Sequence, residues 1–225
     1  MTDQKFRWIW LLLPLWLSFA GCQQKEVEYY DNGNKKTEFT KKSGEFDGES
    51  IWYYKNEQPK IIANYKAGKL HGPTYHFFYD GRKARETHYK EGLKDGKALE
   101  WHDNGKQKQI ASYRKDTLHD AYKEFFRENG AIKTEGTYHQ GVRDSLWVWY
   151  YPNGLKASEA DFDMGNGKRT YWFSDGKKES VITYRDDKKH GKAWYFNKKG
   201  DTIKISVFEE DRLKDEQLLI DLNNL

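Results

Sequence analysis

A phrase of aromatic residues followed by Asn-Gly or Asp-Gly recurs along this chain about every 24 residues. It is written YYDNGNKK at 29–36 and YYPNGLKA at 150–157. Between Gly33 and Gly81, which lie two periods apart, the segment KNEQ at 55–58 supplies a further turn, with Glu57 at the glycine position. The sequence therefore contains eight units of about 24 residues. The glycines of the complete turns are Gly33, Gly81, Gly105, Gly130, Gly154, Gly176 and Gly200.

Three further columns keep the same register in nearly every unit, which indicates a repeated structural element rather than a binding or catalytic site. An aromatic residue stands four positions before each turn glycine, at Tyr29, Tyr53, Phe77, Trp101, Phe126, Tyr150, Trp172 and Phe196. Another stands eight positions after it, at Tyr65, Tyr89, Tyr113, Tyr138, Phe162, Tyr184 and Phe208, with Phe39 in the first unit. A second turn column contains Gly48, Gly72, Gly96, Ala121, Ser145, Gly167 and Gly191.

Each unit has the pattern of a β-hairpin. Residues 145–151 are rich in Trp, Val and Tyr, which favour strands, and Asn153-Gly154 is a strong hairpin-turn signal. Residues 155–162 then return as the second strand. An aromatic content of 16% argues against disorder despite a mean hydropathy of −1.07. We therefore predict an all-β protein in which sixteen strands form an elongated, twisted antiparallel meander over residues 29–208.

The units resemble MORN repeats, and more closely the bacterial MORN-variant group that is often labelled as toxin–antitoxin antitoxins. The motif that carries this resemblance is aromatic-aromatic-x-Asn-Gly-x-x-Lys, then Tyr, then Gly-x-x-(Asp/His)-Gly, over roughly residues 27–216. The resemblance implies a meander of antiparallel hairpins in a long, twisted sheet. Glycines of the motif are replaced at Glu57, Ala121 and Ser145, and at these positions the sequence does not define the turn geometry.

The N-terminal segment has the composition of a secretory signal peptide. Lys5 and Arg7 precede an apolar stretch at 8–19, which is shorter than the roughly 20 residues that span a bilayer. Small residues follow at Ala20 and Gly21. We predict a signal peptide at 1–21, and the alternative is an uncleaved anchor helix.

Cys22 is the only cysteine, so the chain forms no intramolecular disulfide and keeps no cysteine nucleophile once this thiol is modified. The segment SFAGC at 18–22 resembles the lipobox of bacterial lipoproteins, although Phe19 replaces the usual Leu, Val or Ile. The resemblance implies cleavage before Cys22, diacylglycerol on its thiol, and further acylation by chains such as palmitate. Two or more chains anchor a protein stably. We expect residues 22–28 to form a tether to the cell envelope, with the outer membrane favoured because residue 23 is Gln rather than Asp.

The sequence predicts no catalytic residues, no cofactor and no metal site. It contains neither a G-x-S-x-G motif nor a phosphate-binding loop. His71 and His119 share a turn position two units apart, roughly 20 Å by strand spacing, whereas zinc ligands lie about 2 Å from one ion. A net charge of +4 from interspersed residues also argues against nucleic-acid binding.

Residues 147–151 provide the candidate binding face. Because side chains alternate along a strand, Trp147, Trp149 and Tyr151 should share one face, and Val148 and Tyr150 the other. A single-layer sheet cannot bury both faces. Either the aromatic face binds a partner, or the twisted sheet packs onto its own aromatic residues.

We expect a protein that is not an enzyme, and three functions remain open for such a repeat array. The favoured one is a lipid-anchored scaffold that binds an unknown protein partner in the cell envelope. The alternatives are an antitoxin or immunity-like neutraliser of a toxin, and a carbohydrate or peptidoglycan binder that stacks Trp and Tyr rings on sugars. Residues 209–225 should cap the array as a short helix or a last strand, through Leu218, Leu219, Ile220 and Leu222.

Overall fold

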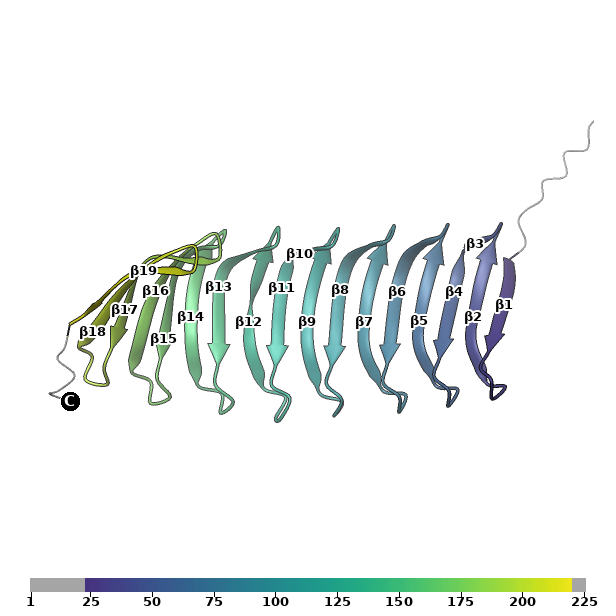
Figure 1. Cartoon of the computed structure of the whole chain (residues 1–225), viewed down its shortest axis with the longest axis horizontal. Coiled ribbons are helices and arrows are strands. Elements are labelled where there is room, and N and C mark those ends of the chain that lie inside the picture. Colours follow the sequence, from purple (N-terminus) through teal and green to yellow (C-terminus); the bar gives the residue numbers. More distant parts are fainter. Residues whose placement is uncertain (1–22, 220–225) are drawn as a thin grey trace, which may run out of the picture.

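The computed structural model describes residues 23–219, and these form a single sheet of antiparallel strands (Figure 1). The predicted signal peptide, Cys22 and residues 220–225 lie outside the described residues. The all-β prediction is confirmed. The strands are β1 (Gln23–Tyr29), β2 (Lys35–Lys42), β3 (Glu45–Phe46), β4 (Gly48–Tyr53), β5 (Pro59–Lys66), β6 (Lys69–Phe77), β7 (Lys83–Lys90), β8 (Leu93–Trp101), β9 (Gln107–Arg114), β10 (Thr117–Leu118), β11 (Asp120–Phe125), β12 (Ile132–His139), β13 (Val142–Tyr150), β14 (Lys156–Asp163), β15 (Asn166–Trp172), β16 (Lys178–Arg185), β17 (Lys188–Phe196), β18 (Thr202–Glu209) and β19 (Arg212–Leu218).

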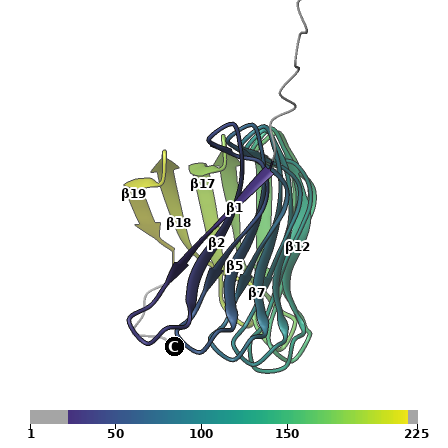
Figure 2. The same ribbon diagram turned by 90° about the vertical axis from the view of Figure 1, so that its right-hand side faces the viewer.

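The strands pair in chain order, so the predicted meander is confirmed, but it has nineteen strands from Gln23 to Leu218 in place of the predicted sixteen over residues 29–208. Both β3 and β4 pair with β2, and both β10 and β11 pair with β9, which makes each couple one interrupted strand. All other strands pair antiparallel with their neighbours in sequence, as from β5 to β6 and from β17 to β18. Viewed along the array, the sheet is a single curved layer (Figure 2).

The prediction of a tether at residues 22–28 is wrong for residues 23–28, because these belong to β1 of the sheet. All residues of β1 are exposed, so no hydrophobic pattern marks it in the sequence. It is held by its backbone pairing with β2 and by ion pairs of Lys25 with Glu38 (3.0 Å) and of Lys41 with Glu26 (2.7 Å). The folded array therefore begins one residue after Cys22.

The C-terminal end of the described chain is a strand. β19 pairs with β18 along its length, and all its residues are exposed. Leu218 and Leu219, two of the predicted capping residues, are 59% and 43% exposed. Ile220 and Leu222 lie outside the described residues.

The Asn-Gly turns join each unit to the next. In a typical turn, Asn104 Oδ1 accepts the Lys106 backbone N–H (3.1 Å), while Asn104 Nδ2 donates to the Arg127 carbonyl of the following unit (2.8 Å). The same pair of hydrogen bonds recurs at Asn56 and Asn129. Tyrosine hydroxyls beside the turns add parallel links, from Tyr30 to the Tyr53 carbonyl, Tyr54 to the Phe77 carbonyl and Tyr151 to the Trp172 carbonyl.

The second turn of each unit is joined to the preceding unit by backbone hydrogen bonds. The N–H of Gly92 donates to the Leu70 carbonyl (2.8 Å), and that of Asp116 to the Lys94 carbonyl (2.9 Å). An aspartate in the strand after such a turn adds a side-chain link, as where Asp95 Oδ2 of β8 accepts the Lys115 N–H of the next turn at 3.4 Å. Consecutive units are thus hydrogen-bonded at both turns as well as between their strands.

The column predicted as the second turn lies within strands, since Gly72, Gly96 and Ser145 belong to β6, β8 and β13. The chain turns about four residues earlier, as at Ala67-Gly68 and Gln140-Gly141.

The left-handed backbone is still present at or beside the three positions where the motif lacks glycine. Glu57 and Ser145 adopt the left-handed backbone themselves, with φ of 64° and 58°. Near Ala121, the preceding Asp120 takes that role, with φ of 64°. A non-glycine residue there costs on the order of 1 kcal/mol, which the hydrogen bonds of the array offset.

One face of the sheet carries a row of small residues that pair across consecutive strands, and we call it the small-residue face. The row contains Ser50, Ala63, Thr74, Thr87, Ala98 and Ala111. Longer side chains two residues along each strand, such as Tyr65 and Tyr89, flank this row and are half-buried. In residues 23–219, only eight hydrophobic residues are fully buried, four of them alanines. The array therefore has little enclosed core.

We expect deletion of residues 83–106 to yield a folded, shorter protein. This removes 24 residues and places Gln107 where Lys83 stood, so every column remains in register. Deletion of residues 83–94 removes half a unit and breaks the hydrogen bonds that join both turns to the neighbouring units, so we do not expect this chain to fold. Circular dichroism and thermal melting of the two deletions check this, and equal cooperativity of both would contradict a repeat of this length.

We expect Asn104→Asp to reduce the free energy of unfolding by roughly 1 kcal/mol, because it keeps the turn acceptor and loses the donor to the next unit. Asn104→Ala loses both and should cost roughly twice as much. Asn153→Asp is the matched control, since Asn153 accepts the Leu155 N–H and, within residues 23–219, has no donor bond to the next unit. Urea denaturation measures all three, and an equal loss at Asn153 would contradict the role of the donor.

Candidate interaction face

The three residues of the predicted binding face occupy different environments. Trp147 is buried, with 2% of its surface exposed, whereas Trp149 is half-buried and stacks on it with ring centroids 5.7 Å apart. Tyr151 lies beyond the end of β13, and its hydroxyl donates to the Trp172 carbonyl at 2.7 Å. The structure therefore brings Trp147 and Trp149 together and places Tyr151 among the turn contacts. Trp147 cannot reach a partner without repacking.

Trp147 is buried because the neighbouring strand offers a glycine. The indole lies so close to Gly136 that a Cβ there would come within 2.2 Å of Trp147 Cδ2. Trp147 Nε1 donates to the Thr137 carbonyl at 2.9 Å, which satisfies its only polar group. Tyr122 and Tyr138 pack around the ring, at centroid distances of 5.8 and 4.9 Å. At this point of the array, the sheet packs onto its own aromatic residues, as the second alternative for this face expected.

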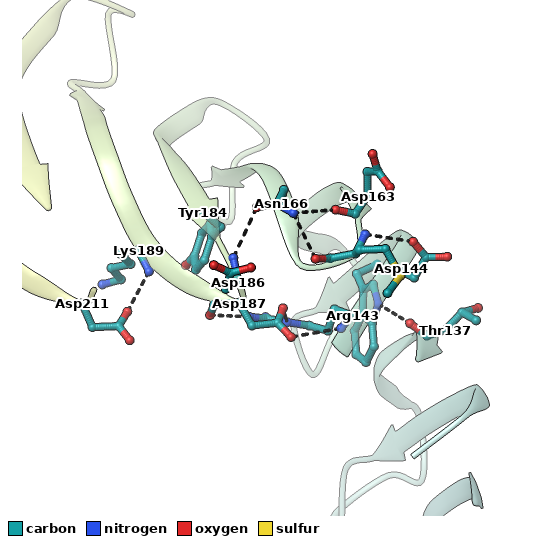
Figure 3. A network of polar contacts seen from close by, with 12 residues as sticks. Thr137, Arg143, Asp144, Asp163, Asn166, Tyr184, Asp186, Asp187, Lys189 and Asp211 are labelled. Carbon is teal, nitrogen blue, oxygen red and sulfur yellow. Dashed lines mark hydrogen bonds and ion pairs between the residues drawn. The ribbon is translucent and has the colours of Figure 1, made fainter. Parts of the chain in front are cut away.

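A polar network lies beside this cluster, where the second turns of three units converge (Figure 3). Asp187 accepts hydrogen bonds from the Arg143 backbone N–H (3.0 Å) and from Arg143 Nε (2.7 Å), across two units. The intervening turn permits this approach because it contains Gly165, and Gly167 at the start of β15 permits close contact with β14. A Cβ on Gly165 would lie 2.9 Å from the Asp187 nitrogen, and one on Gly167 would lie 2.4 Å from the Asp161 carbonyl oxygen.

The network accompanies a change in the direction of the array. Gly165 N–H donates to the Arg143 carbonyl at 2.7 Å, and Asp187 N–H to the Gly165 carbonyl at 3.0 Å, so the turns are tied in sequence. The strands after β14 are inclined relative to the earlier ones (Figure 1). Of the adjacent Asp186 and Asp187, the second is therefore paired with an arginine of the array.

Arg169 of β15 lies on the same face and was missed by the sequence analysis. Its Cζ is 3.4 Å from the ring centroid of Trp149 and 4.5 Å from that of Tyr171. Its Nε and Nη2 donate to Ser158 Oγ at 2.9 and 2.7 Å. Burial lowers the pKa of the Arg169 guanidinium, and burial also raises the pKa of the Tyr171 hydroxyl. The alternation of Arg169 and Tyr171 along one strand was the available sequence signal.

The small-residue face changes character in the middle of the array. A polar hollow of about 220 Å³ there is lined by Arg85, Tyr89, Glu100 and Tyr113, among others. Glu100 pairs with Arg85 at 2.8 Å and, from the neighbouring strand, with Lys108 at 2.9 Å. Burial raises the pKa of both tyrosines. Glu100 thus pairs with Arg85 in this hollow, whereas Lys94, which also lines it, lies over the Tyr113 ring with Nζ 5.0 Å from the centroid.

Two of the histidines lie close together. His119 and His139 lie with ring centroids 5.1 Å apart, which their separation in sequence did not indicate. Among residues 23–219, no group of three or more His, Cys, Asp or Glu side chains is placed to hold a metal ion. That part of the chain also has no helix long and apolar enough to cross a membrane.

We expect Gly136→Ala to destabilise the fold by about 1–3 kcal/mol, because the added methyl group collides with the Trp147 indole. Trp147→Ala should cost about 3–5 kcal/mol on its own. In the Trp147→Ala background, Gly136→Ala should cost much less, since the colliding ring is gone. Chemical denaturation of the four chains gives the coupling, and additive effects would show that the two residues do not depend on each other.

Comparison with known families identifies the repeat. The family model described as MORN repeat variant matches residues 46–67 and 94–115, which lie two periods apart. Each match spans one strand pair and the turn between its strands, β4–β5 with Asn56-Glu57 in the first and β8–β9 with Asn104-Gly105 in the second. The resemblance to MORN-variant repeats is therefore confirmed at these two units, and the repeat is of a structural, non-catalytic type. No curated protein matches the chain.

Proposed function

We propose that this chain of MORN-variant repeats is a lipid-anchored protein of the cell envelope that binds a protein partner as a scaffold. The observation that carries the proposal is the single-layer sheet, in which no second layer covers either face within residues 23–219. The repeat itself is consistent with a binding role. Most small residues of the row are buried, as with Ser50 and Ala111 at 0% and 1% exposure, so the flanking side chains of the small-residue face are what a partner would contact.

Half-buried aromatic residues support binding through the small-residue face. Trp and Tyr side chains bury large areas at interfaces and are frequent among the residues that dominate binding energy. On this face they keep part of their surface accessible to solvent. They are Trp52, Tyr65, Tyr89, Tyr113, Trp149, Tyr171 and Tyr195.

The anchor is supported by the sequence alone, since Cys22 lies outside the described residues. A lone cysteine after SFAG, at the end of a signal-like segment, is the position that lipoprotein processing modifies. Because β1 begins at Gln23, lipid on Cys22 would hold the first strand of the array close to the membrane surface. With Gln rather than Asp at position 23, we favour the outer membrane.

The proposal is tested by crosslinking the protein in intact cells, followed by affinity purification and mass spectrometry. We expect one protein partner in near-stoichiometric amounts. A partner with toxin activity would identify the neutraliser function instead of a scaffold. Recovery of glycan fragments without a reproducible protein would overturn the proposal in favour of peptidoglycan binding.

We expect Cys22→Ala to abolish incorporation of labelled palmitate and to leave unprocessed precursor, because the acceptor thiol is lost. Phe19→Leu is the matched control. It restores the usual lipobox residue and should keep or increase labelling. Gel autoradiography after metabolic labelling measures both chains, and undiminished labelling of the Cys22→Ala chain would sink the lipid-anchor proposal.

A further inference from the structure

We propose that Arg169, framed by Trp149 and Tyr171, is a recognition site for a carboxylate side chain of a partner protein. This inference rests on the proposed scaffold function and assigns the place and the chemistry of one contact. The three side chains lie on the small-residue face, where Arg169 pairs with Ala160 and Ile182 in the central row. At this position of the row, a guanidinium replaces the small or apolar residues of its neighbours.

The small residues of β14 explain how the site is built. Ser158 and Ala160 are 1% and 2% exposed and lie between β13 and β15. Because their side chains are short, Trp149 from β13 and Arg169 from β15 meet above them, with Arg169 Cζ 3.4 Å from the indole centroid. Ser158 Oγ accepts from Nε and Nη2 and fixes one edge of the guanidinium. The Nη1 edge is not used by this contact.

The charge of Arg169 is not neutralised by the protein. In residues 23–219, no carboxylate lies within ion-pair distance of it, whereas Arg143 on the same face has Asp187 at 2.7 Å. A guanidinium stays protonated even when burial lowers its pKa. Ring faces compensate only part of the cost of burying such a charge. An anionic group from outside would complete the site.

The neighbouring hydroxyls add a donor to the same place. Tyr171 and Tyr184 hydroxyls lie 3.1 Å apart, and one of them donates to the other. One hydroxyl proton of the pair remains to donate to an incoming oxygen. A planar guanidinium edge with an adjacent hydroxyl matches the two oxygens of a carboxylate, and the Trp149 and Tyr171 rings match apolar groups beside it.

A protein carboxylate fits this site better than a polyanion does. Nucleic acids and other polyanions are held by several cations on one surface. Here the next residue, Lys168, points to the opposite face, with Nζ 5.8 Å from the Trp194 ring centroid. Arg143, the other arginine of this face nearby, is occupied by Asp187. Trp, Tyr and Arg, the residue types that meet here, are enriched among the residues that dominate binding energy at protein interfaces.

The test is NMR titration of the whole protein, labelled at indole and guanidinium nitrogens, with two dipeptide probes. N-acetyl-Glu-Phe-amide supplies a carboxylate and a ring, and N-acetyl-Gln-Phe-amide is its neutral match. We expect saturable shifts of the Trp149 indole and Arg169 Nε signals with the Glu probe at concentrations up to about 50 mM. The Gln probe should bind at least about tenfold more weakly. Equal binding of both probes, or no saturable shift, overturns the inference.

Two variants locate the effect. Arg169→Gln should remove the preference for the Glu probe, whereas Lys168→Gln removes the same charge one residue away on the other face and should leave binding unchanged. Should Arg169→Gln fail to fold, Arg169→Lys decides, because it keeps the charge but lacks the planar fork and should bind more weakly. Unaltered binding in Arg169→Lys would contradict the site. Inorganic phosphate that binds as well as the Glu probe would also contradict carboxylate recognition.

The crosslinking experiment separates this inference from the proposed function. If the wild-type chain captures a protein partner and the Arg169→Gln chain captures it equally, the scaffold function stands and the site is wrong. If the Glu probe binds at Arg169 but intact cells yield no protein partner, the site stands and the scaffold function is wrong.

Discussion

The hydrogen bonds that run from the turns of one unit to the next are the interaction on which this structure depends. A single-layer sheet cannot gain much from an enclosed core, and here the buried hydrophobic residues are few and mostly small. Asn104 shows the solution, since one amide side chain closes its own turn and binds the next unit. At the opposite ends of the strands, backbone groups of the second turns, such as Gly92 N–H, donate hydrogen bonds to the preceding unit. Stability therefore accumulates unit by unit.

This construction leaves the surface of the sheet free for function. The row of small residues and the turns are repeated, because register and close strand approach require them. The positions beside that row vary, from the neutralised pair of Arg85 and Glu100 to the unpaired Arg169 beside Trp149. The rings of Trp149 and Tyr171 frame this unpaired cation, with centroids 3.4 and 4.5 Å from Arg169 Cζ. A repeated framework thus carries a local surface that can discriminate between partners.

The sequence columns predicted the fold because they report local chemistry, in which Asn-Gly favours tight turns and aromatic residues favour strands. The site was less predictable because it depends on what lies across the sheet. The Trp147 ring can be buried because Gly136 has no side chain to collide with it, and only the strand register places Gly136 beside the ring. Arg143 and Asp187 are 44 residues apart, and their meeting depends on Gly165 in the turn between them, where a Cβ would lie 2.9 Å from the Asp187 nitrogen. The exposed β1 carries no hydrophobic pattern, so its pairing with β2 was also missed.

Native-state hydrogen exchange of the turn amides tests most directly whether the units are held together at their turns. The decisive amides are those of Gly68, Gly92, Asp116 and Gly141, each of which donates to a carbonyl of the preceding unit. The account predicts that they are protected to the same degree as amides in the adjoining strands, because they open only when two units separate. Rapid exchange, as in the exposed turns of ordinary hairpins, would contradict it.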